Sequence, residues 1–192
     1  MNNDLSSQLS QHARDSAMLS KRSIFISEAI TSDSARKFVS DLIVLDTLSQ
    51  DPITIYLNSP GGEVNSGFSI YDTIRFLESK VTIVNTGLCA SIATIINVSV
   101  PKARRFSMPN ARFLIHQPLI SGVVQGPASD IEITAHEISK TRDRLNQILS
   151  ESCEQELKRV EQDTQRDYWM SSSEAIEYGL IGKIVTQKSQ IK

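Results

Sequence analysis

The chain has 192 residues, of which 40% are hydrophobic and 22% are charged, and its formal net charge is −2 at pH 7. This length and composition predict one domain with a sizeable core, and the charge offers no basic surface for nucleic acid or a membrane. The two cysteines, Cys89 and Cys153, lie inside apolar or helical patterns, and no apolar run reaches membrane-spanning length. We therefore expect a cytoplasmic protein without a nucleic-acid or membrane partner.

Residues 1–20 are polar and have no clear period, which predicts a mobile N-terminal arm. Strand and helix patterns alternate after the arm. Strands are predicted at 23–27, 53–57, 81–86 and 110–115. Helices are predicted at 32–45, at 68–77, from 91, from 127, near 154–161 and from 171 to 179. The alternation is typical of βαβ units and favours an α/β fold with a mainly parallel sheet and crossover helices.

Several boundaries of these elements follow from local signals. Gly87 is expected to end the third strand, before an apolar segment of helical length. Pro127 suits the first position of the long helix, whose length indicates that it projects from the core or packs on another subunit. Ser171 and Glu174 form a capping-box pattern before the last helix, and Gly179 ends it.

Ser91 is the candidate nucleophile because it lies at a predicted strand-to-helix turn. The first N–H groups of a helix lack partners and favour negative charge. Acyl transfer needs a hydroxyl beside such donors, which stabilise the oxyanion of the transition state. Position alone also fits an ordinary N-cap serine. The assignment therefore depends on the residues that accompany it.

An activated serine needs a base, and the base needs a carboxylate to orient it. Of the three histidines, His116 alone closes a buried-looking strand, whereas His12 lies in the arm and His136 lies on the long helix. A core histidine that is satisfied by backbone groups is the alternative for His116. Asp163 and Asp167 both lie in a predicted polar loop before a helix, and the residues themselves do not choose between them.

Motifs over about 22–186 carry a family resemblance. They are 58–62 (NSPGG), 70–74 (IYDTI), 87–91 (GLCAS), 108–111 (MPNA), 115–118 (IHQP), 130–133 (DIEI), 166–168 (RDY) and 174–181 (EAIEYGLI). In this order and spacing, the chain resembles the proteolytic subunit of the Clp protease, a serine peptidase. The resemblance implies a crotonase-like α/β fold of repeated β-β-α units with a projecting handle helix. It divides the chain into an axial arm, 1–20, and one catalytic domain, 21–192, with the handle at about 117–153.

The resemblance also assigns roles. Ser91 would be the nucleophile, His116 the general base and then acid, and Asp167 the orienting carboxylate, in preference to Asp163. The backbone N–H groups of Gly62 and Ile92 would form the oxyanion hole. The implied activity is serine-type endopeptidase cleavage of unfolded polypeptides.

The implied assembly is two heptameric rings face to face around a chamber. A separate AAA+ ATPase would unfold and deliver the substrates. The sequence has no Gly-x-x-x-x-Gly-Lys-Ser/Thr motif and no metal-ligand spacing, so we expect no bound cofactor or metal, with ATP used by the partner.

Three features depart from the family pattern. Residues 15–20 lack the usual segment that leads from the axial pore, and Ile120–Val124 is bulkier and longer than the usual glycine-rich connection. Gln165 stands where an acidic residue commonly precedes Arg166, so an inter-ring ion pair would lose one charge. These departures suggest a paralogue that works in mixed rings with a second Clp-type subunit.

Two other functions compete with an active peptidase. One is a catalytically silent or partner-dependent structural subunit of a mixed ring, against which the complete Ser, His and Asp set argues. The other is a crotonase-type acyl-CoA enzyme on the same scaffold. Its acidic acid/base residues have no obvious counterpart here, and fold alone does not separate it from a peptidase.

Overall fold

The computed structural model describes residues 13–119 and 125–191, which form seven strands in one sheet. The strands are β1 (Ser23–Ile26), β2 (Ile53–Ser59), β3 (Val81–Ala90), β4 (Arg105–Ser107), β5 (Arg112–Ile115), β6 (Tyr168–Ser171) and β7 (Lys183–Ile184). The helices are α2 (Ser32–Leu48), α3 (Val64–Phe76), α4 (Ile92–Asn97), α5 (Ala128–Cys153), α6 (Leu157–Asp163) and α7 (Ser172–Tyr178). Two 3₁₀ turns, η1 (Lys102–Arg104) and η2 (Lys188–Gln190), complete the set. Residues 13–20 are helical, and Leu19 packs against the core.

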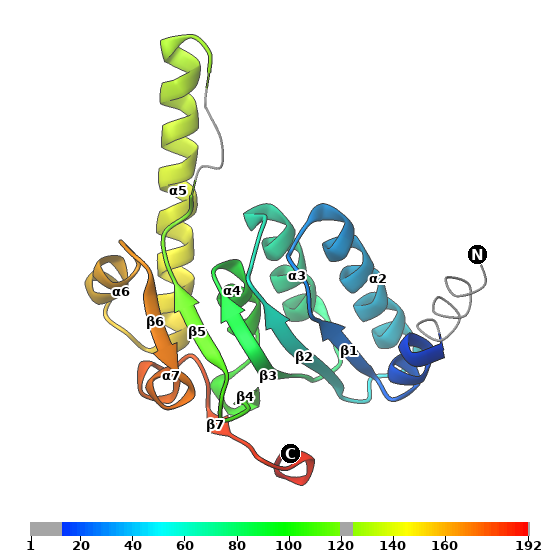
Figure 1. The fold of residues 1–192 in the computed structure, drawn as a ribbon. Coiled ribbons are helices and arrows are strands. Elements are labelled where there is room, and N and C mark those ends of the chain that lie inside the picture. The colour runs from blue at the N-terminus through cyan, green and yellow to red at the C-terminus, as the bar shows by residue number, and fades with distance from the viewer. Residues whose placement is uncertain (1–12, 120–124, 192) are drawn as a thin grey trace, which may run out of the picture.

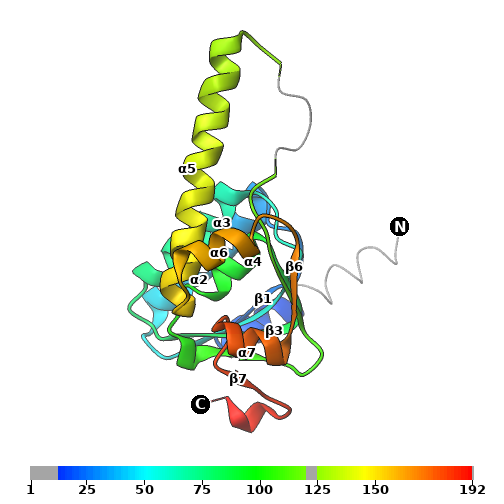
Figure 2. The same cartoon turned by 90° about the vertical axis from the view of Figure 1, so that its left-hand side faces the viewer.

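The sheet is mainly parallel. Its main path runs β1-β2-β3-β4-β7 with every neighbouring pair parallel, while β5 pairs parallel with β3 and antiparallel with β6. Figure 2 shows the helices gathered on one side of this sheet. The predicted α/β class with crossover helices is therefore confirmed.

The core lies between the sheet and these helices. Along β2, Ile53, Ile55 and Leu57 are completely buried, and the residues that alternate with them are half-buried. On the alternate positions, the rings of Phe25 and Tyr56 stack with centroids 5.0 Å apart, and Phe25 stays half exposed. The alternation reflects a sheet that is covered by helices on one face only.

Gly87 does not end the third strand, because β3 continues to Ala90. At Gly87 the register between β2 and β3 shifts, and the Asn58 side chain accepts a hydrogen bond from the Leu88 N–H at 2.8 Å. A Cβ atom on Gly87 would lie 2.5 Å from that same Asn58 oxygen. The glycine therefore lets a side chain replace a missing ladder bond, and the strand runs on toward Ser91.

Three short strands were not predicted. β4 has three residues, β6 has four and β7 has two, and each pairs with a segment far away in the sequence. β6 occupies part of the stretch that we interpreted as a polar loop. Within that stretch Asp163 is the last residue of α6, and Asp167 directly precedes β6.

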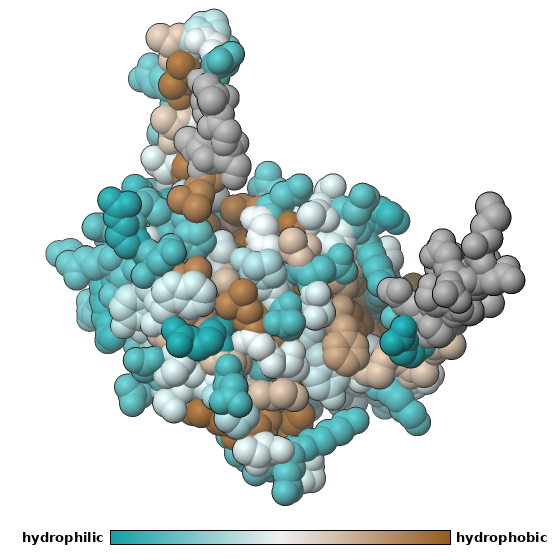
Figure 3. All heavy atoms as spheres, in the orientation of Figure 1, coloured by the Kyte–Doolittle hydropathy of each residue, from teal (hydrophilic) through white to brown (hydrophobic). Residues whose placement is uncertain are grey.

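α5 projects from the body of the molecule, as Figure 1 shows. Its buried residues all lie from Leu145 onward, so its first 17 residues have no buried position. Pro127 is the N-cap, with extended backbone angles, rather than the first helical residue. Figure 3 shows brown, apolar surface on this projection. Ile131 and Ile133 of α5 are exposed, as is Leu119 in the segment that follows β5. Ile120–Val124, the segment that differs from the family pattern, and residues 1–12 lie outside the described residues.

The termini of α7 match their sequence signals. Ser171 accepts a hydrogen bond from the Glu174 N–H, and Glu174 accepts one from the Ser171 N–H at 2.7 Å. These bonds hold the pKa of Glu174 below its ordinary value. Gly179 then closes the helix with a positive φ of 94°. The predicted capping box and glycine stop are confirmed.

Candidate active site

Ser91 occupies a sharp turn between β3 and α4. Its φ of 57° and ψ of −129° lie in a region that non-glycine residues rarely adopt. Such a conformation costs on the order of 1–3 kcal/mol and persists only where the surroundings impose it. One restraint is its own N–H, which donates to the Leu114 carbonyl of β5 at 2.8 Å. The helix that follows has only six residues, shorter than the apolar pattern indicated.

A glycine turn packs directly against this serine. A Cβ atom on Gly61 would lie 2.6 Å from the Ala90 carbonyl oxygen and 2.7 Å from the Ser91 Cβ. Gly61 has a φ of 87°, so both the space and the backbone conformation require glycine. The turn that follows β2 is thereby brought within contact of the turn that follows β3.

Ile30 fixes the other side of the glycine turn. Its N–H donates to the Gly61 carbonyl at 2.8 Å, and its carbonyl accepts from the Glu63 N–H at 2.8 Å. In this parallel bridge the N–H of Gly62 faces away from Ile30. A Cβ atom on Gly62 would lie 2.1 Å from the Ile30 carbonyl oxygen, which leaves room for glycine alone.

Two backbone donors therefore flank Ser91. The Gly62 N–H has no acceptor among the hydrogen bonds of the described residues. Ile92 is the first residue of α4, so its N–H has no partner within that helix. Unpaired N–H groups beside a hydroxyl are what an oxyanion hole requires.

His116 and Asp167 meet because of sheet register. In the antiparallel pair of β5 and β6, Ile115 is opposite Tyr168, so the next two residues face each other beyond the strand ends. His116 Nδ1 lies 3.8 Å from Asp167 Oδ1. The His116 side chain is 14% exposed and the Asp167 side chain 65%. Of the two candidate carboxylates, only Asp167 is paired with His116 in the described residues, while Asp163 lies 3.6 Å from Arg159.

The contact between Ser91 and His116 is not complete. The two residues follow adjacent parallel strands, β3 and β5, at the carboxyl ends where sites of open α/β sheets form. No hydrogen bond joins the Ser91 hydroxyl to His116 within the described part of the chain, and 3.8 Å exceeds a hydrogen bond for the His116–Asp167 pair. Catalytic hydrogen bonds are often long without substrate and tighten on binding.

Cys89, two residues before Ser91, is not a competing nucleophile. It is completely buried, and burial raises the pKa of its thiol far above the ordinary value. Among residues 13–119 and 125–191, no group of His, Cys, Asp and Glu side chains could hold a metal ion. None of the helices described is long and apolar enough to cross a membrane.

Sequence reasoning missed the residues that support this site from a distance. Ile30 clamps the glycine turn, Asn58 sets the bend of β3, and Gln117 donates its N–H to the Thr164 carbonyl at 2.6 Å. Their partners lie about 30 or more residues away, so no local pattern marks them. Asn58 and Gln117 did have a signal, because they belong to the 58–62 and 115–118 motifs, whereas Ile30 had none.

A serine on a strained turn, a histidine near a carboxylate and two backbone N–H groups thus gather at one edge of a mainly parallel sheet, an arrangement that fits the class of serine hydrolases. A family model described as Clp protease matches residues 7–188, and the chain belongs to the Clp protease family. It is a proteolytic subunit of this type, a serine peptidase.

The curated relatives are also named as Clp protease proteolytic subunits. The chain is 47% identical over 174 residues to the ATP-dependent Clp protease proteolytic subunit 3 of Rhizobium etli, covering 91% of this chain and 89% of the relative. It is 41% identical over 173 residues to proteolytic subunit 2 of Pseudomonas aeruginosa, covering 90% and 85%. A solved structure of a ClpP1 point mutant from Listeria monocytogenes superposes with a TM-score of 0.85 at 36% identity, covering 93% of this chain and 99% of that one. The expected fold and family are confirmed.

Proposed function

We propose that Ser91, His116 and Asp167 form the catalytic triad of this peptidase. The observation that carries the proposal is the approach of His116 Nδ1 to Asp167 Oδ1, 3.8 Å apart, beside a strained serine turn. His116 would take the Ser91 proton as the hydroxyl attacks the peptide carbonyl, and would return it to the leaving amine. Asp167 would hold the imidazole in the tautomer that presents Nε2 to Ser91.

The Gly62 and Ile92 N–H groups would bind the oxyanion of the tetrahedral intermediate. Neither group has a hydrogen-bond acceptor among the described residues, which supports this role. Water would then hydrolyse the acyl-enzyme by the same route in reverse, with His116 again acting as base and then acid. No cofactor enters these steps.

The quaternary proposal is two heptameric rings face to face, with residues 1–20 as the axial arm and residues 21–192 as the catalytic domain. The handle, about 117–153, would mediate contact between the rings. Exposed Leu119, Ile131 and Ile133 support this, because burying their apolar surface against a second copy would be favourable. Unfolded polypeptides would be fed by a separate AAA+ ATPase in the cytoplasm, where free Cys89 and Cys153 suit a reducing environment.

A partner-dependent subunit is the second candidate. The observation in its favour is the long His116–Asp167 distance together with the missing Ser91–His116 bond. Gln165 in place of an acidic residue would weaken pairing between identical rings. Assembly with a second Clp-type subunit would then draw the triad together.

A fluorophosphonate probe tests both proposals. The purified chain is labelled alone and after mixing with a candidate partner subunit, and oligomer mass is measured in parallel. Ser91→Ala should abolish labelling and peptide cleavage, a loss of at least about 10³-fold. The matched control is Ser20→Ala, which removes an exposed hydroxyl that donates to the Ala17 carbonyl.

The outcomes separate the candidates. Labelling of a homogeneous double ring at Ser91 supports a self-sufficient peptidase, and labelling only after mixing supports the partner-dependent subunit. Cleavage by the Ser91→Ala chain at a rate near wild type would refute the triad itself.

A further inference from the structure

Gly67 lies inside α3, where glycine is an unfavourable residue. A glycine within a helix destabilises it relative to alanine, because glycine gives up the most backbone freedom on folding. The backbone at Gly67 is ordinarily helical: its N–H donates to the Glu63 carbonyl at 3.0 Å, and its φ is not among the positive values of the described residues. The conformation of the chain therefore does not require glycine here, and the reason must be the space around it.

Ile92 occupies the space that a side chain at position 67 would need. A Cβ atom on Gly67 would lie 2.1 Å from Ile92 Cγ1, 3.1 Å from its Cδ1 and 3.2 Å from its Cβ, and these are its three nearest atoms. Ile92 is 2% exposed, and because it is branched at Cβ it keeps one strongly preferred rotamer in a helix. Its side chain cannot swing away from α3, so a methyl group on Gly67 would displace the Ile92 backbone instead.

α3 connects the two N–H groups that we propose for the oxyanion hole. Gly62 lies two residues before this helix begins, and Gly67 is its fourth residue. Gly67 contacts Ile92, whose own N–H is the second donor, and α3 and α4 lie side by side (Figure 1). A Cβ atom on Gly61 would lie 3.2 Å from the Ile92 nitrogen, so the glycine turn and the start of α4 are in contact as well.

Packing sets the position of α4. Its N-cap, Ser91, makes no capping hydrogen bond with its side chain. The Thr94 N–H and hydroxyl donate to the Ser91 carbonyl at 2.9 and 2.7 Å, which fixes the first turn only within itself. All six residues of α4 are buried, so its position relative to the glycine turn depends on the side chains that it packs against α3.

We propose that Gly67 is a positioning residue for the proteolytic reaction: the space that it leaves seats Ile92 against α3 and thereby sets the separation of the Gly62 and Ile92 N–H groups. This inference rests on the oxyanion hole of the proposed function. Donors of an oxyanion hole act at about 2.7–3.1 Å from the oxyanion, so a change of about 1 Å in their separation leaves one of them out of range.

The test introduces the missing methyl group with Gly67→Ala. Ordinary contact begins at 3.4 Å, so Ile92 must move by about 1.3 Å. We expect kcat for a fluorogenic peptide to fall by about 10²-fold with KM changed by less than about twofold, because the donors act mainly in the transition state. A peptide aldehyde of the same sequence should bind more weakly by a similar factor. Its carbon bonds to the Ser91 oxygen, its carbonyl oxygen becomes an oxyanion, and the hydroxyl proton passes to His116.

Ile92→Ala removes the atom in conflict and keeps the backbone N–H. Alone, it should lower kcat by about tenfold, because the start of α4 loses its contact with α3. In this background Gly67→Ala should lower kcat no further, and the double variant should exceed Gly67→Ala alone by about tenfold, since contacting residues are non-additive. Ile92→Val keeps Cγ1 and should not restore the activity of Gly67→Ala.

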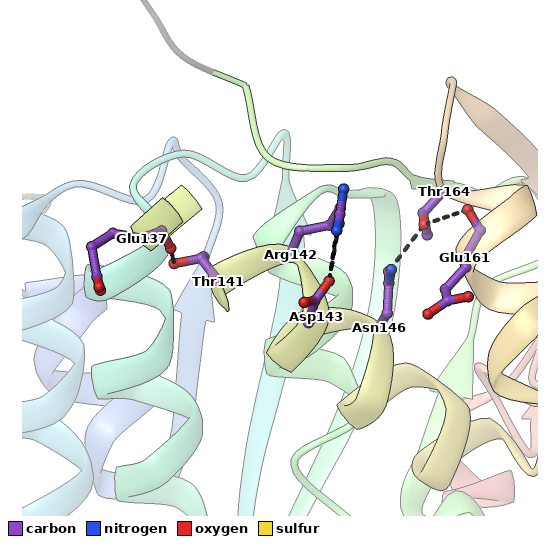
Figure 4. Close-up of polar contacts among 7 residues, drawn as sticks. All are labelled: Glu137, Thr141, Arg142, Asp143, Asn146, Glu161 and Thr164. Atoms are coloured by element: carbon purple, nitrogen blue, oxygen red, sulfur yellow. Dashed lines mark hydrogen bonds and ion pairs between the residues drawn. The ribbon is translucent and has the colours of Figure 1, made fainter. Parts of the chain in front are cut away.

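Two controls separate positioning from a general loss of stability. Ile74→Ala truncates a buried side chain at the other end of α3, near Val81, the first residue of β3. It should lower Tm and leave kcat per folded molecule within about twofold of wild type. Asn146→Ala breaks the bond between Thr164 and Asn146 at the base of α5, which Figure 4 shows, and Ile92→Ala should not restore any activity lost there. Circular dichroism gives the folded fraction for every rate.

Distinct results overturn the inference and the proposed function. Wild-type kcat for Gly67→Ala, a loss that stays undiminished beside Ile92→Ala, or recovery of Asn146→Ala by Ile92→Ala overturns the positioning role while the triad stands. If Gly67→Ala does not fold, the Ile92 variants decide: alanine should lower kcat at least about fivefold more than valine, and equal rates overturn the role. Cleavage that survives Ser91→Ala overturns the triad, and the positioning role falls with it.

Discussion

Replacing Gly62 by alanine perturbs the proposed oxyanion hole without touching the triad. A Cβ atom there would lie 2.1 Å from the Ile30 carbonyl oxygen, whereas ordinary contact begins at 3.4 Å. The turn must therefore move by about 1.3 Å. A displacement of that size carries the Gly62 N–H out of hydrogen-bond range of the oxyanion. Loss of one such donor typically lowers kcat by about 10² to 10³, or about 2.7–4 kcal/mol of transition-state stabilisation.

The assay is steady-state cleavage of a fluorogenic peptide, normalised to the folded fraction. We expect kcat of Gly62→Ala to fall by about 10²-fold or more with little change in KM, because the donor acts mainly in the transition state. Gly182→Ala is the matched control. Its Cβ atom would lie 2.3 Å from the Lys102 carbonyl oxygen, which is a similar steric conflict. Gly182 directly precedes the edge strand β7, which is separated from β3 by β4.

The comparison of Gly62→Ala with Gly182→Ala tests whether the Gly62 N–H stabilises the oxyanion. Both should lose thermal stability, but only Gly62→Ala should lose kcat per folded molecule. Equal kcat in the two variants, or a loss for Gly62→Ala that appears in KM alone, would refute the role assigned to the Gly62 N–H.

Two predictions concern stability. The pKa of Glu174 is lowered by hydrogen bonds from Ser171, so the stabilisation is present above the ordinary value near 4.5 and is lost as the pH falls through the native value. Glu174→Gln should therefore lower Tm at pH 7, and the loss should shrink as the pH falls below 4.5; a loss of constant size across this range would contradict the capping argument. Arg105 is 4% exposed and donates to the Val100, Ser152 and Gly179 carbonyls. Arg105→Met should cost at least about 3 kcal/mol in urea unfolding, since each of the three carbonyls left unpaired costs about 1–3 kcal/mol, and a cost below about 1 kcal/mol would show that water replaces the guanidinium.

Elements with local physical causes could be predicted from the sequence. The alternation of apolar strands with helices that are apolar on one side predicted the parallel sheet. Each strand or helix carries its own apolar pattern, which can be recognised without knowing which segments it contacts. Ser171, Glu174 and Gly179 were recognised because capping involves residues within one or two turns. Ser91 was placed at its strand-to-helix turn for the same reason.

Features that depend on pairing across the sheet could not be predicted in this way. β6 was missed because four residues gain their strand conformation only by pairing with β5, more than 50 residues earlier. Without β6, the residues gave no reason to prefer Asp167 over Asp163, and the family resemblance had to make that choice. Gly87 was misinterpreted because its partner, the Asn58 side chain, comes from a different strand. The roles of the site residues remain predictions that the proposed variants test.

The projection of α5 has a consequence for folding. Its first 17 residues include no fully buried position, and most helical stability in proteins comes from tertiary packing of an apolar face. In the proposed double ring, a second copy would cover Ile131 and Ile133 and supply packing that the single chain lacks. The stability of the outer part of α5 and the association of subunits would then be linked by mass action, so dilution would make this part of the helix fray before the sheet beneath it unfolds.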